Sequence, residues 1–438
     1  LKLTNKYCLR LARKIIGLLS KLKQAKMDKN VSLEYKRFNL LRLQEAEDKV
    51  LPFSKLFKNK GLYRPLLLWA YNTTKDIYSY LPLRKNGQDP FLHPTNIVIY
   101  LQRARISDPL TLTAAMLHDY VEEKVDKFVE ELNIKKDKEG MHMIAEYELS
   151  VFEELEGELE EIAFKNNLPI SEMYDIIEII KLLTRHKQHF YYSSMGGIFS
   201  YVNKDIKRRA IQVKLADRIH NILSIECFNE EDRIYQCFKN LFILNNVKMY
   251  LLKAYGPKIF TTQKFVPCER LFNWCGKATY DAFLTICQMC SKRGIKEVKP
   301  LLHFALKKYL FEKEGLFQAT DVDPKETHPI RLFQGIVKKY DQRLHREMVK
   351  FEKSKEAEKR YCGRFFRDYN FNKEQLQALI DYKDAYALRE YIAQLIYLPS
   401  FYTTNFLTSK LSKAGRIKLA QKKAVSRVFP SYFWSKLF

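Results

Sequence analysis

The stretch DPLTLTAAMLHDYVEE, residues 108–123, sets the fold class of this chain. Asp108 followed by Pro109 is a strong helix start, because an aspartate caps free backbone N–H groups and proline fits the first helical turn. Apolar residues then recur at three- and four-residue spacing, which predicts one continuous helix through Glu123. The same spacing covers most of the 438 residues, and few stretches alternate with period two. We therefore expect an all-α fold.

Pro, Gly, Asn and Asp residues divide the expected helices into three parts. Residues 1–60 form a basic helical N-terminal segment, and residues 61–228 form a compact helical bundle. Residues 229–438 form a further, mostly helical region of unknown role. Its basic tail, 391–438, holds 8 Lys or Arg and no Asp or Glu. The tail is either a solvated pair of basic helices or a surface for RNA or a protein partner.

The formal net charge of +25 is unevenly distributed. Residues 122–161 hold 15 acidic and 5 basic side chains, a local balance of −10. The basic excess elsewhere favours polyanionic partners such as nucleotides, RNA or an anionic membrane surface. A Lys-rich solvated surface would give the same charge without any such partner.

The cysteines and the uncharged runs indicate a compartment. Eight cysteines in a chain of this length do not suggest a disulfide scaffold, which favours a reducing environment. The longest uncharged run, 391–409, contains Pro399 and many hydroxyl and amide side chains, which argues against a membrane span. The chain begins at Leu1, and its basic opening is not interpreted as a targeting peptide. We expect a cytoplasmic protein with no membrane span.

The HD pair at 118–119 is the first candidate for chemistry. On a helix, His118 shares a face with Glu122, and Asp119 shares one with Glu122 and Glu123. A metal ion could take the histidine and the aspartate, leaving the two glutamates to orient or deprotonate a water. Adjacent His-Asp pairs are common, so the site needs further ligands.

Two other segments supply them. In DPFLHPTNI, His93 stands before a proline at a loop-to-helix junction. In VKLADRIHNILS, Asp217, Asn221 and Ser224 form one polar stripe on an otherwise apolar helix. A buried carboxylate is costly unless it is paired or coordinating. Two imidazoles and two carboxylates suit Mn²⁺, Fe²⁺, Co²⁺ or Zn²⁺ better than Ca²⁺.

Three segments in order, RKNGQDPFLHP, LTAAMLHDYVEE and VKLADRIHNI, carry a family resemblance. Together they resemble the HD-domain hydrolase of the RelA/SpoT alarmone enzymes and their small hydrolase-only relatives, the metazoan SpoT homologues. The match spans roughly residues 61–228, under half of the chain, and KLADRIHN is its most specific piece. The resemblance implies an HD-domain helical bundle with metal-dependent phosphohydrolase activity.

The resemblance also implies roles for individual positions. The implied metal ligands, with Mn²⁺ as the usual ion, are His93, His118, Asp119 and Asp217. The implied water-positioning pair is Glu122 and Glu123. The implied substrate-binding residues are Arg84 and Lys85 at the nucleotide's phosphates, and Asn221 and Ser224 near its ribose and base. The implied reaction removes the 3′-pyrophosphate of (p)ppGpp to give GDP or GTP. Hydrolysis of another phosphorylated nucleotide or dinucleotide, or a non-catalytic nucleotide- or RNA-binding regulator, remain the alternatives.

This chain departs from the family pattern in three respects. Glu123 replaces an aspartate, and Ser224 replaces a threonine. Asp119 and Asp217 are 98 residues apart, which is longer than the family pattern, and the acidic stretch about 122–161 is the expected insertion. It could gate or narrow substrate choice. No synthetase domain is evident after residue 230.

Other candidate ligands have a less specific pattern. His186 and His189 could share a helix face and recruit a second metal, and His220 fits a hydrogen-bonding core residue better than a ligand. A zinc site at the cysteine cluster competes with a simpler interpretation, in which these residues are buried thiols. The cluster comprises Cys268, Cys275, Cys287 and Cys290.

Overall fold

The helical spacing of the sequence produces an all-α protein, as predicted. In the computed structural model, the residues described are 45–58, 61–135, 137–187, 189–261, 265–294, 329–397, 399–404 and 418–419. Within them, the strand structure is a single short antiparallel ladder, in which β1 (Thr403–Thr404) pairs with β2 (Lys418–Leu419). Much of the predicted N-terminal segment (1–44 and 59–60) and most of the basic tail (405–417 and 420–438) lie outside these residues.

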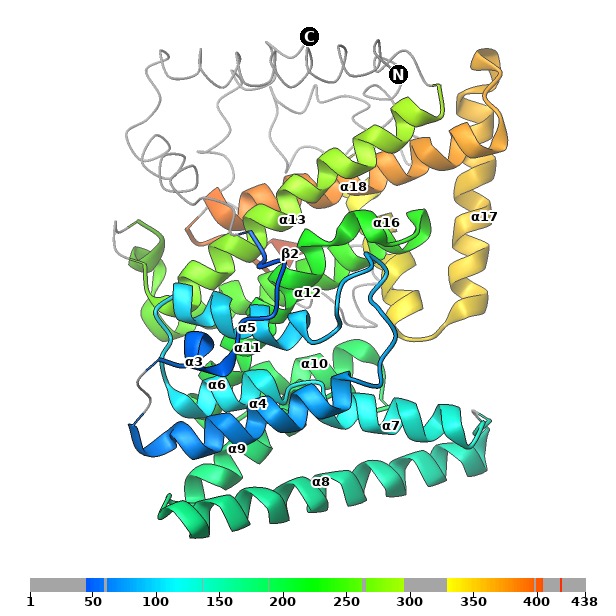
Figure 1. The fold of residues 1–438 in the computed structure, drawn as a ribbon. Coiled ribbons are helices and arrows are strands. Elements are labelled where there is room, and N and C mark those ends of the chain that lie inside the picture. The colour runs from blue at the N-terminus through cyan, green and yellow to red at the C-terminus, as the bar shows by residue number, and fades with distance from the viewer. Residues whose placement is uncertain are drawn as a thin grey trace.

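Figure 1 shows the arrangement of the helices in the described residues. Up to residue 228 they are α3 (Phe53–Leu56), η2 (Gly61–Tyr63), α4 (Arg64–Tyr78), α5 (Leu92–Arg103), α6 (Pro109–Met116), α7 (Tyr120–Glu131), α8 (Lys138–Asn166), α9 (Ile170–Leu183), α10 (Tyr191–Ser200), α11 (Lys204–Leu223) and η3 (Ile225–Cys227). After it they are α12 (Glu230–Tyr255), η4 (Pro257–Thr261), α13 (Pro267–Lys292), α16 (Pro329–Leu344), α17 (Met348–Phe365), η6 (Arg367–Tyr369) and α18 (Lys373–Tyr397).

Helix α11 is the centre of the architecture. It packs against α5, α6 and α9 on one side and against α12 and α13 on the other. Figure 1 shows α8 as the outermost helix on one side of α11, with α13 and α18 beyond the other side. The buried side chains form one cluster from Leu56 to Phe401, which crosses residue 228 without a break. A domain boundary near 228 stays a prediction.

Capping side chains fix the starts of the helices around α11. Asp108 accepts a hydrogen bond from the Thr111 backbone N–H at 3.2 Å, the N-cap that the sequence predicts. Arg209 of α11 donates to the same Asp108 carboxylate at 2.8 Å and to Asp175 of α9 at 3.3 Å. One arginine thus ties α11 to the start of α6 and to α9.

The single helix predicted through residue 123 is wrong, because α6 ends at Met116 and α7 begins at Tyr120. Side chains take the carbonyl groups that a continuous helix would use. The Thr74 hydroxyl donates to the Met116 carbonyl at 3.1 Å, and the His118 ring bonds to the Ala115 carbonyl at 2.9 Å. Because these two carbonyls already accept hydrogen bonds from side chains, they do not need the backbone N–H groups four residues further along. The HD pair therefore occupies a turn between two helices.

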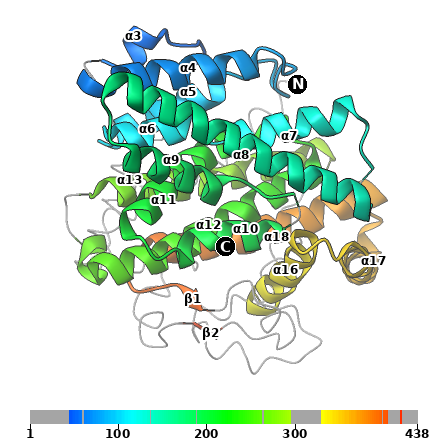
Figure 2. The same cartoon turned by 90° about the horizontal axis from the view of Figure 1, so that it is seen from below.

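The acidic stretch 122–161 lies in α7 and in the 29-residue helix α8. Figure 2 shows α8 crossing the near face of the molecule, and it packs against α4, α7 and α9. Its buried Val151, Phe152, Leu155 and Leu159 recur at helical spacing, so its apolar stripe faces the bundle and its carboxylates face outward. Within the described residues no helix is long and apolar enough to span a membrane.

Candidate metal centre

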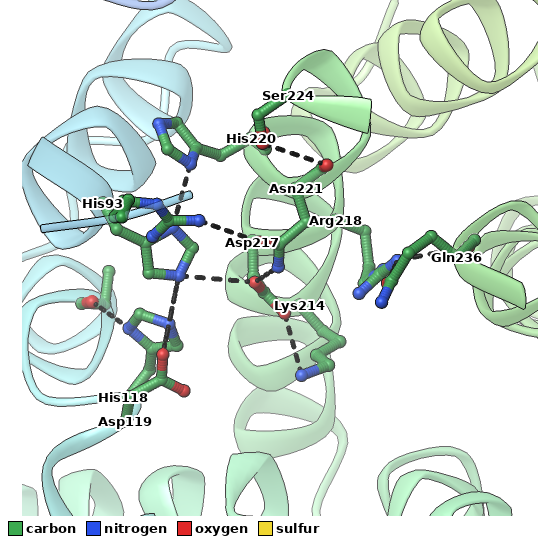
Figure 3. Close-up of polar contacts among 12 residues, drawn as sticks. His93, His118, Asp119, Lys214, Asp217, Arg218, His220, Asn221, Ser224 and Gln236 are labelled. Atoms are coloured by element: carbon green, nitrogen blue, oxygen red, sulfur yellow. Dashed lines mark hydrogen bonds and ion pairs between the residues drawn. The ribbon is translucent and has the colours of Figure 1, made fainter. Parts of the chain in front are cut away.

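Two histidines from different helices meet beside α11. His93 lies in the first turn of α5, and His118 lies in the turn between α6 and α7. Their Nε2 atoms are 3.2 Å apart, and both side chains are buried. Figure 3 shows the two rings facing the Asp217 side chain on α11.

Two carboxylates approach the same pair of nitrogens. Asp217 Oδ1 is 3.5 Å from His93 Nε2. Asp119 Oδ2 is 3.5 Å from His93 Nε2 and 3.0 Å from His118 Nε2. The Asp119 side chain is 26% exposed, whereas that of His118 is 1% exposed. Solvent therefore reaches this cluster on the Asp119 side.

The spacing of His93 Nε2, His118 Nε2 and the Asp217 carboxylate fits a shared cation, whereas a ligand role for Asp119 stays a prediction. An ion bonded at about 2.1 Å to tetrahedral or octahedral donors holds adjacent donors about 3.0–3.4 Å apart. His93, His118 and Asp217 form a buried group that can hold a metal ion. Within the described part of the chain it is the one group of three or more such ligands.

Hydrogen bonding of the imidazoles supports the same interpretation. The Ala115 carbonyl can only accept, so the His118 Nδ1 that contacts it carries the proton. In neutral His118, Nε2 then carries no proton, and its lone pair is available on the side of His93 Nε2. A cation between the two nitrogens would be bound by both lone pairs. His93 Nδ1 in turn lies 3.0 Å from His220 Nδ1, so His220 orients a ligand from behind, consistent with the role expected for it.

The electrostatics of the centre keep its carboxylates ionised. Burial opposes the charge on Asp217, but Lys214 and His93 outweigh it and lower the pKa of Asp217. Burial likewise opposes the charge on Asp119, yet its contacts with His118 and His93 hold the pKa of Asp119 well below its usual range. Two ionised carboxylates beside two imidazoles make a donor set suited to a divalent cation.

A further layer of polar groups supports Asp217. Lys214 Nζ lies 2.8 Å from Asp217 Oδ2, and the Asn221 amide donates to Asp217 Oδ1 at 2.5 Å. Arg84 donates to the Asn221 oxygen at 3.3 Å. Two of the predicted substrate-binding residues, Arg84 and Asn221, thus lie next to the metal-ligand group.

The predicted water-positioning glutamates lie in the first turn of α7. Glu122 accepts a hydrogen bond from the Arg185 backbone N–H at 2.6 Å, which fixes its carboxylate against the loop after α9. Burial and then the charge of Asp119 raise the pKa of Glu122. The same causes, followed by Asp126 and Glu122, raise the pKa of Glu123 to about 7. Both groups are therefore close enough to Asp119 to respond to its charge.

Two predicted substrate-binding residues make other contacts. Lys85 is exposed, and its ammonium lies 5.0 Å from the Phe228 ring centroid. Ser224 caps the end of α11, and its hydroxyl bonds to the His220 and Asn221 carbonyls at 3.3 Å. Neither residue makes a direct contact with the metal-ligand group. Their roles toward a substrate stay predictions.

The remaining candidate ligands belong to other environments. His186 bonds to Glu148 of α8, and its ring lies 5.5 Å from that of His189, but these residues are not among the groups of the described chain that could hold a metal ion. Cys268 and Cys275 are buried free thiols in α13, and burial raises the pKa of each to about 12. The side chains of Cys287 and Cys290 lie outside the part that the structure describes.

Comparison with known proteins adds no second line of support. No protein-family model, curated protein or solved structure matches the chain. The resemblance to the RelA/SpoT hydrolases rests on its three sequence motifs.

One supporting residue was detectable in the sequence and was missed. Lys214 precedes Asp217 by three residues on the same helix, the spacing at which opposite charges pair. The hydrogen bond of Glu122 to the Arg185 backbone joins residues 63 positions apart, and the sequence holds no local signal for it.

Proposed function

We propose that the chain is a metal-dependent phosphohydrolase whose ion is held by His93, His118, Asp119 and Asp217. The observation that carries the proposal is the convergence of the two histidine Nε2 atoms and two carboxylate oxygens within 3.0–3.5 Å contacts. Mn²⁺ is the ion we favour, because the set mixes two imidazoles with two carboxylates. The order of the three sequence motifs supports the same assignment.

Glu122 and Glu123 act on the attacking water in this proposal. A divalent cation bound at the centre supplies Lewis acidity at a phosphoryl oxygen and lowers the pKa of a nearby water. Glu122 is oriented by the Arg185 N–H, so it can direct a water without leaving its position. Glu123, with a pKa raised to about 7, suits proton transfer near neutral pH.

The substrate in this proposal is a nucleotide that carries a phosphate chain. Arg84 is half-buried beside Asn221, and a guanidinium at this position can neutralise phosphate oxygens that approach the centre. By the sequence resemblance, the first substrate to test is guanosine 3′-diphosphate 5′-di- or triphosphate. The leaving group would be pyrophosphate.

A nucleotide screen tests the proposal. The purified chain is assayed with Mn²⁺ against guanosine 3′,5′-bis(diphosphate), a dinucleotide bearing a ribose phosphate, and ordinary nucleoside di- and triphosphates, with released pyrophosphate and phosphate as readouts. Asp217→Asn serves as the matched control, since it keeps the side-chain shape and removes the charge. We expect turnover of at least one of these compounds by the parent and none by the control. Tight binding without turnover would contradict the hydrolase and favour a nucleotide sensor.

A further inference from the structure

Five cations gather between α11 and α12, and we call them the cationic cluster. They come from the loop after α9, from α11, from α12 and from α16, and they are Arg185, Lys214, Arg218, Lys239 and Arg343. Figure 3 shows Arg218 reaching toward Gln236 on the side of α11 away from His93 and His118. Most of the cluster thus lies across α11 from these histidines, and it is linked to the metal-ligand group by the Lys214–Asp217 ion pair and to Glu122 by the Arg185 backbone N–H.

Two tyrosine rings lie among these cations. Lys239 Nζ is 5.0 Å from the Tyr191 ring centroid and 4.5 Å from that of Tyr235. The Arg185 guanidinium carbon is 5.9 Å from the Tyr191 centroid, and that of Arg343 is 4.1 Å from the Tyr235 centroid. The faces of the two tyrosine rings attract these cations, but the rings carry no net charge and so do not neutralise the cations.

Few carboxylates compensate the cluster. Lys214 pairs with Asp217 at 2.8 Å, and Arg343 pairs with Asp232 at 2.7 Å. Arg218 hydrogen-bonds to the neutral groups of Asn240 and Gln236.

Two of the cations have no carboxylate partner. Among the residues that the structure describes, none pairs with Lys239 or with the side chain of Arg185. Burial, followed by the repulsion of the four other cations, lowers the pKa of Lys239 to about 7.

Three buried donors, one on Arg185 and two on α10, are also without partners. The buried Arg185 Nε, Tyr191 hydroxyl and Ser194 hydroxyl have no hydrogen-bond partner in the described part of the chain. Tyr191 and Ser194 are three residues apart in α10 and so share one face of that helix. Buried polar groups are nearly always hydrogen-bonded, and a buried unpaired charge is strongly destabilising. An anionic ligand would satisfy all of these groups at once.

We propose that Arg185, Tyr191, Ser194 and Lys239 form an anion-binding site that takes a phosphate group. A guanidinium, an ammonium and two hydroxyls give donors of different directions, which match the several acceptor oxygens of a tetrahedral phosphate. The proposal does not depend on hydrolysis at the metal centre. The phosphate belongs either to free inorganic phosphate species or to a nucleotide.

Titration calorimetry on metal-free protein tests this site. Inorganic pyrophosphate and, in a second arm, GDP are titrated in the presence of EDTA into the parent, Lys239→Met, Lys253→Met and His118→Ala. Lys253 is exposed on the same helix as Lys239, so its variant removes a charge of the same kind outside the site. Methionine keeps the length of the lysine stem and removes the charge.

We expect the parent to bind pyrophosphate and Lys239→Met to bind it about tenfold or more weakly, because a charge-assisted contact is lost. Lys253→Met should stay within about twofold of the parent, as exposed charges contribute little. His118→Ala should match the parent. Tighter binding of GDP than of pyrophosphate identifies a nucleotide as the source of the phosphate, and the reverse identifies a free phosphate species.

Thermal denaturation guards against a folding artefact. Lys239→Met should melt at a higher temperature than the parent without anion, since a half-buried charge that has no carboxylate partner and is repelled by neighbouring cations is removed. Pyrophosphate should then raise the melting temperature of the parent more than that of the variant at the same concentration. No binding by the parent, equal binding by Lys239→Met, or loss of binding in His118→Ala would each overturn the proposal.

Discussion

The two sides of α11 present opposite electrostatic requirements. On the α5 side, His93, His118 and Asp217 place lone pairs and a carboxylate around one point, which a cation would satisfy. On the α12 side, Arg185 and Lys239 place positive charge among unpaired donors, which an anion would satisfy. Lys214, paired with Asp217, links the two. Two sites of opposite charge can thus lie on the two sides of one central helix.

The difference also shows which kind of site a sequence reveals. The metal-ligand group follows from residue types in three ordered motifs, whereas the two unpaired cations come from two separate elements and form no motif. Substitutions on either side of α11 test this difference, and their expected effects range from a large loss of catalysis to a small change in rate.

The largest effect is expected at the water-positioning pair. Glu122→Gln combined with Glu123→Gln should lower kcat by roughly 10²–10⁴, the usual contribution of positioned acid–base groups. Metal and nucleotide binding should be retained, because neither glutamate is assigned as a ligand. Steady-state kinetics with Mn²⁺, together with metal analysis of the variant, measures both. Turnover as fast as that of the parent would show that the pair has no role in the chemistry.

Arg84 should affect binding more than chemistry. Arg84→Ala is expected to raise KM about tenfold at low salt, with a smaller increase at high salt because ions screen the phosphates. Lys85→Ala is the matched comparison, since the structure places Lys85 over Phe228 and away from Asn221. Equal effects of the two substitutions would contradict the distinction that the structure draws between them.

The sequence predicted the all-α fold because periodicity carries that information, and its motifs named the His93, His118 and Asp217 that the fold brings together. That these residues and Asp119 bind a metal stays a prediction. It did not predict the break at His118, because the Met116 carbonyl is taken by Thr74, which lies 42 residues earlier. Propensity favours a continuous helix there, and a tertiary contact overrides it.

The cationic cluster could not be predicted from the sequence. Arg185 and Lys239 meet at the Tyr191 ring only because α10, which follows Arg185, packs against α12. A short stretch of sequence shows that these residues are charged, but it does not show that they lack carboxylate partners in the folded chain.

A smaller effect is expected from Lys239, on the α12 side of α11, where its charge changes the free energy of unfolding. Burial and then Arg218, Arg185, Lys214 and Arg343 lower the pKa of Lys239 to about 7, from its usual 10.5, while Tyr191 and Tyr235 face the same ammonium. Between these values the unfolded chain binds a proton that the folded chain does not, so stability rises with pH. The destabilisation is therefore complete below about pH 7 and disappears near the pKa of an unfolded lysine, about 10.4.

Urea denaturation of the parent and Lys239→Met measures this contribution of Lys239 to the free energy of unfolding. The variant should be more stable than the parent by about 1 kcal/mol near pH 6.5, as expected on removing a half-buried charge that has no carboxylate partner. That difference should shrink steadily as the pH rises toward 10. A difference that does not change with pH would contradict an unpaired ammonium at Lys239.

The smallest effect is expected from the acidic helix α8. Its Glu148 bonds to His186 and accepts from the Lys187 N–H at 3.4 Å, next to the loop residue Arg185 that holds Glu122. Glu148→Gln should loosen this loop and lower kcat about two- to fivefold, since misplacement of a positioned group slows a reaction. Glu146→Gln is the control, because Glu146 is exposed and lies two residues earlier, on a different face of the same helix. Identical kinetics for both variants would make α8 a passive surface helix.

Metal binding tests the central claim most directly. The parent, stripped with chelator and titrated with Mn²⁺, should bind close to one ion per chain by calorimetry and by elemental analysis after gel filtration. His118→Ala should lose this ion, because removing one of about four protein ligands usually destroys such a site. His186→Ala, which removes a histidine outside the group, should bind it as the parent does. Full occupancy in His118→Ala, or no ion bound by the parent, would contradict the account.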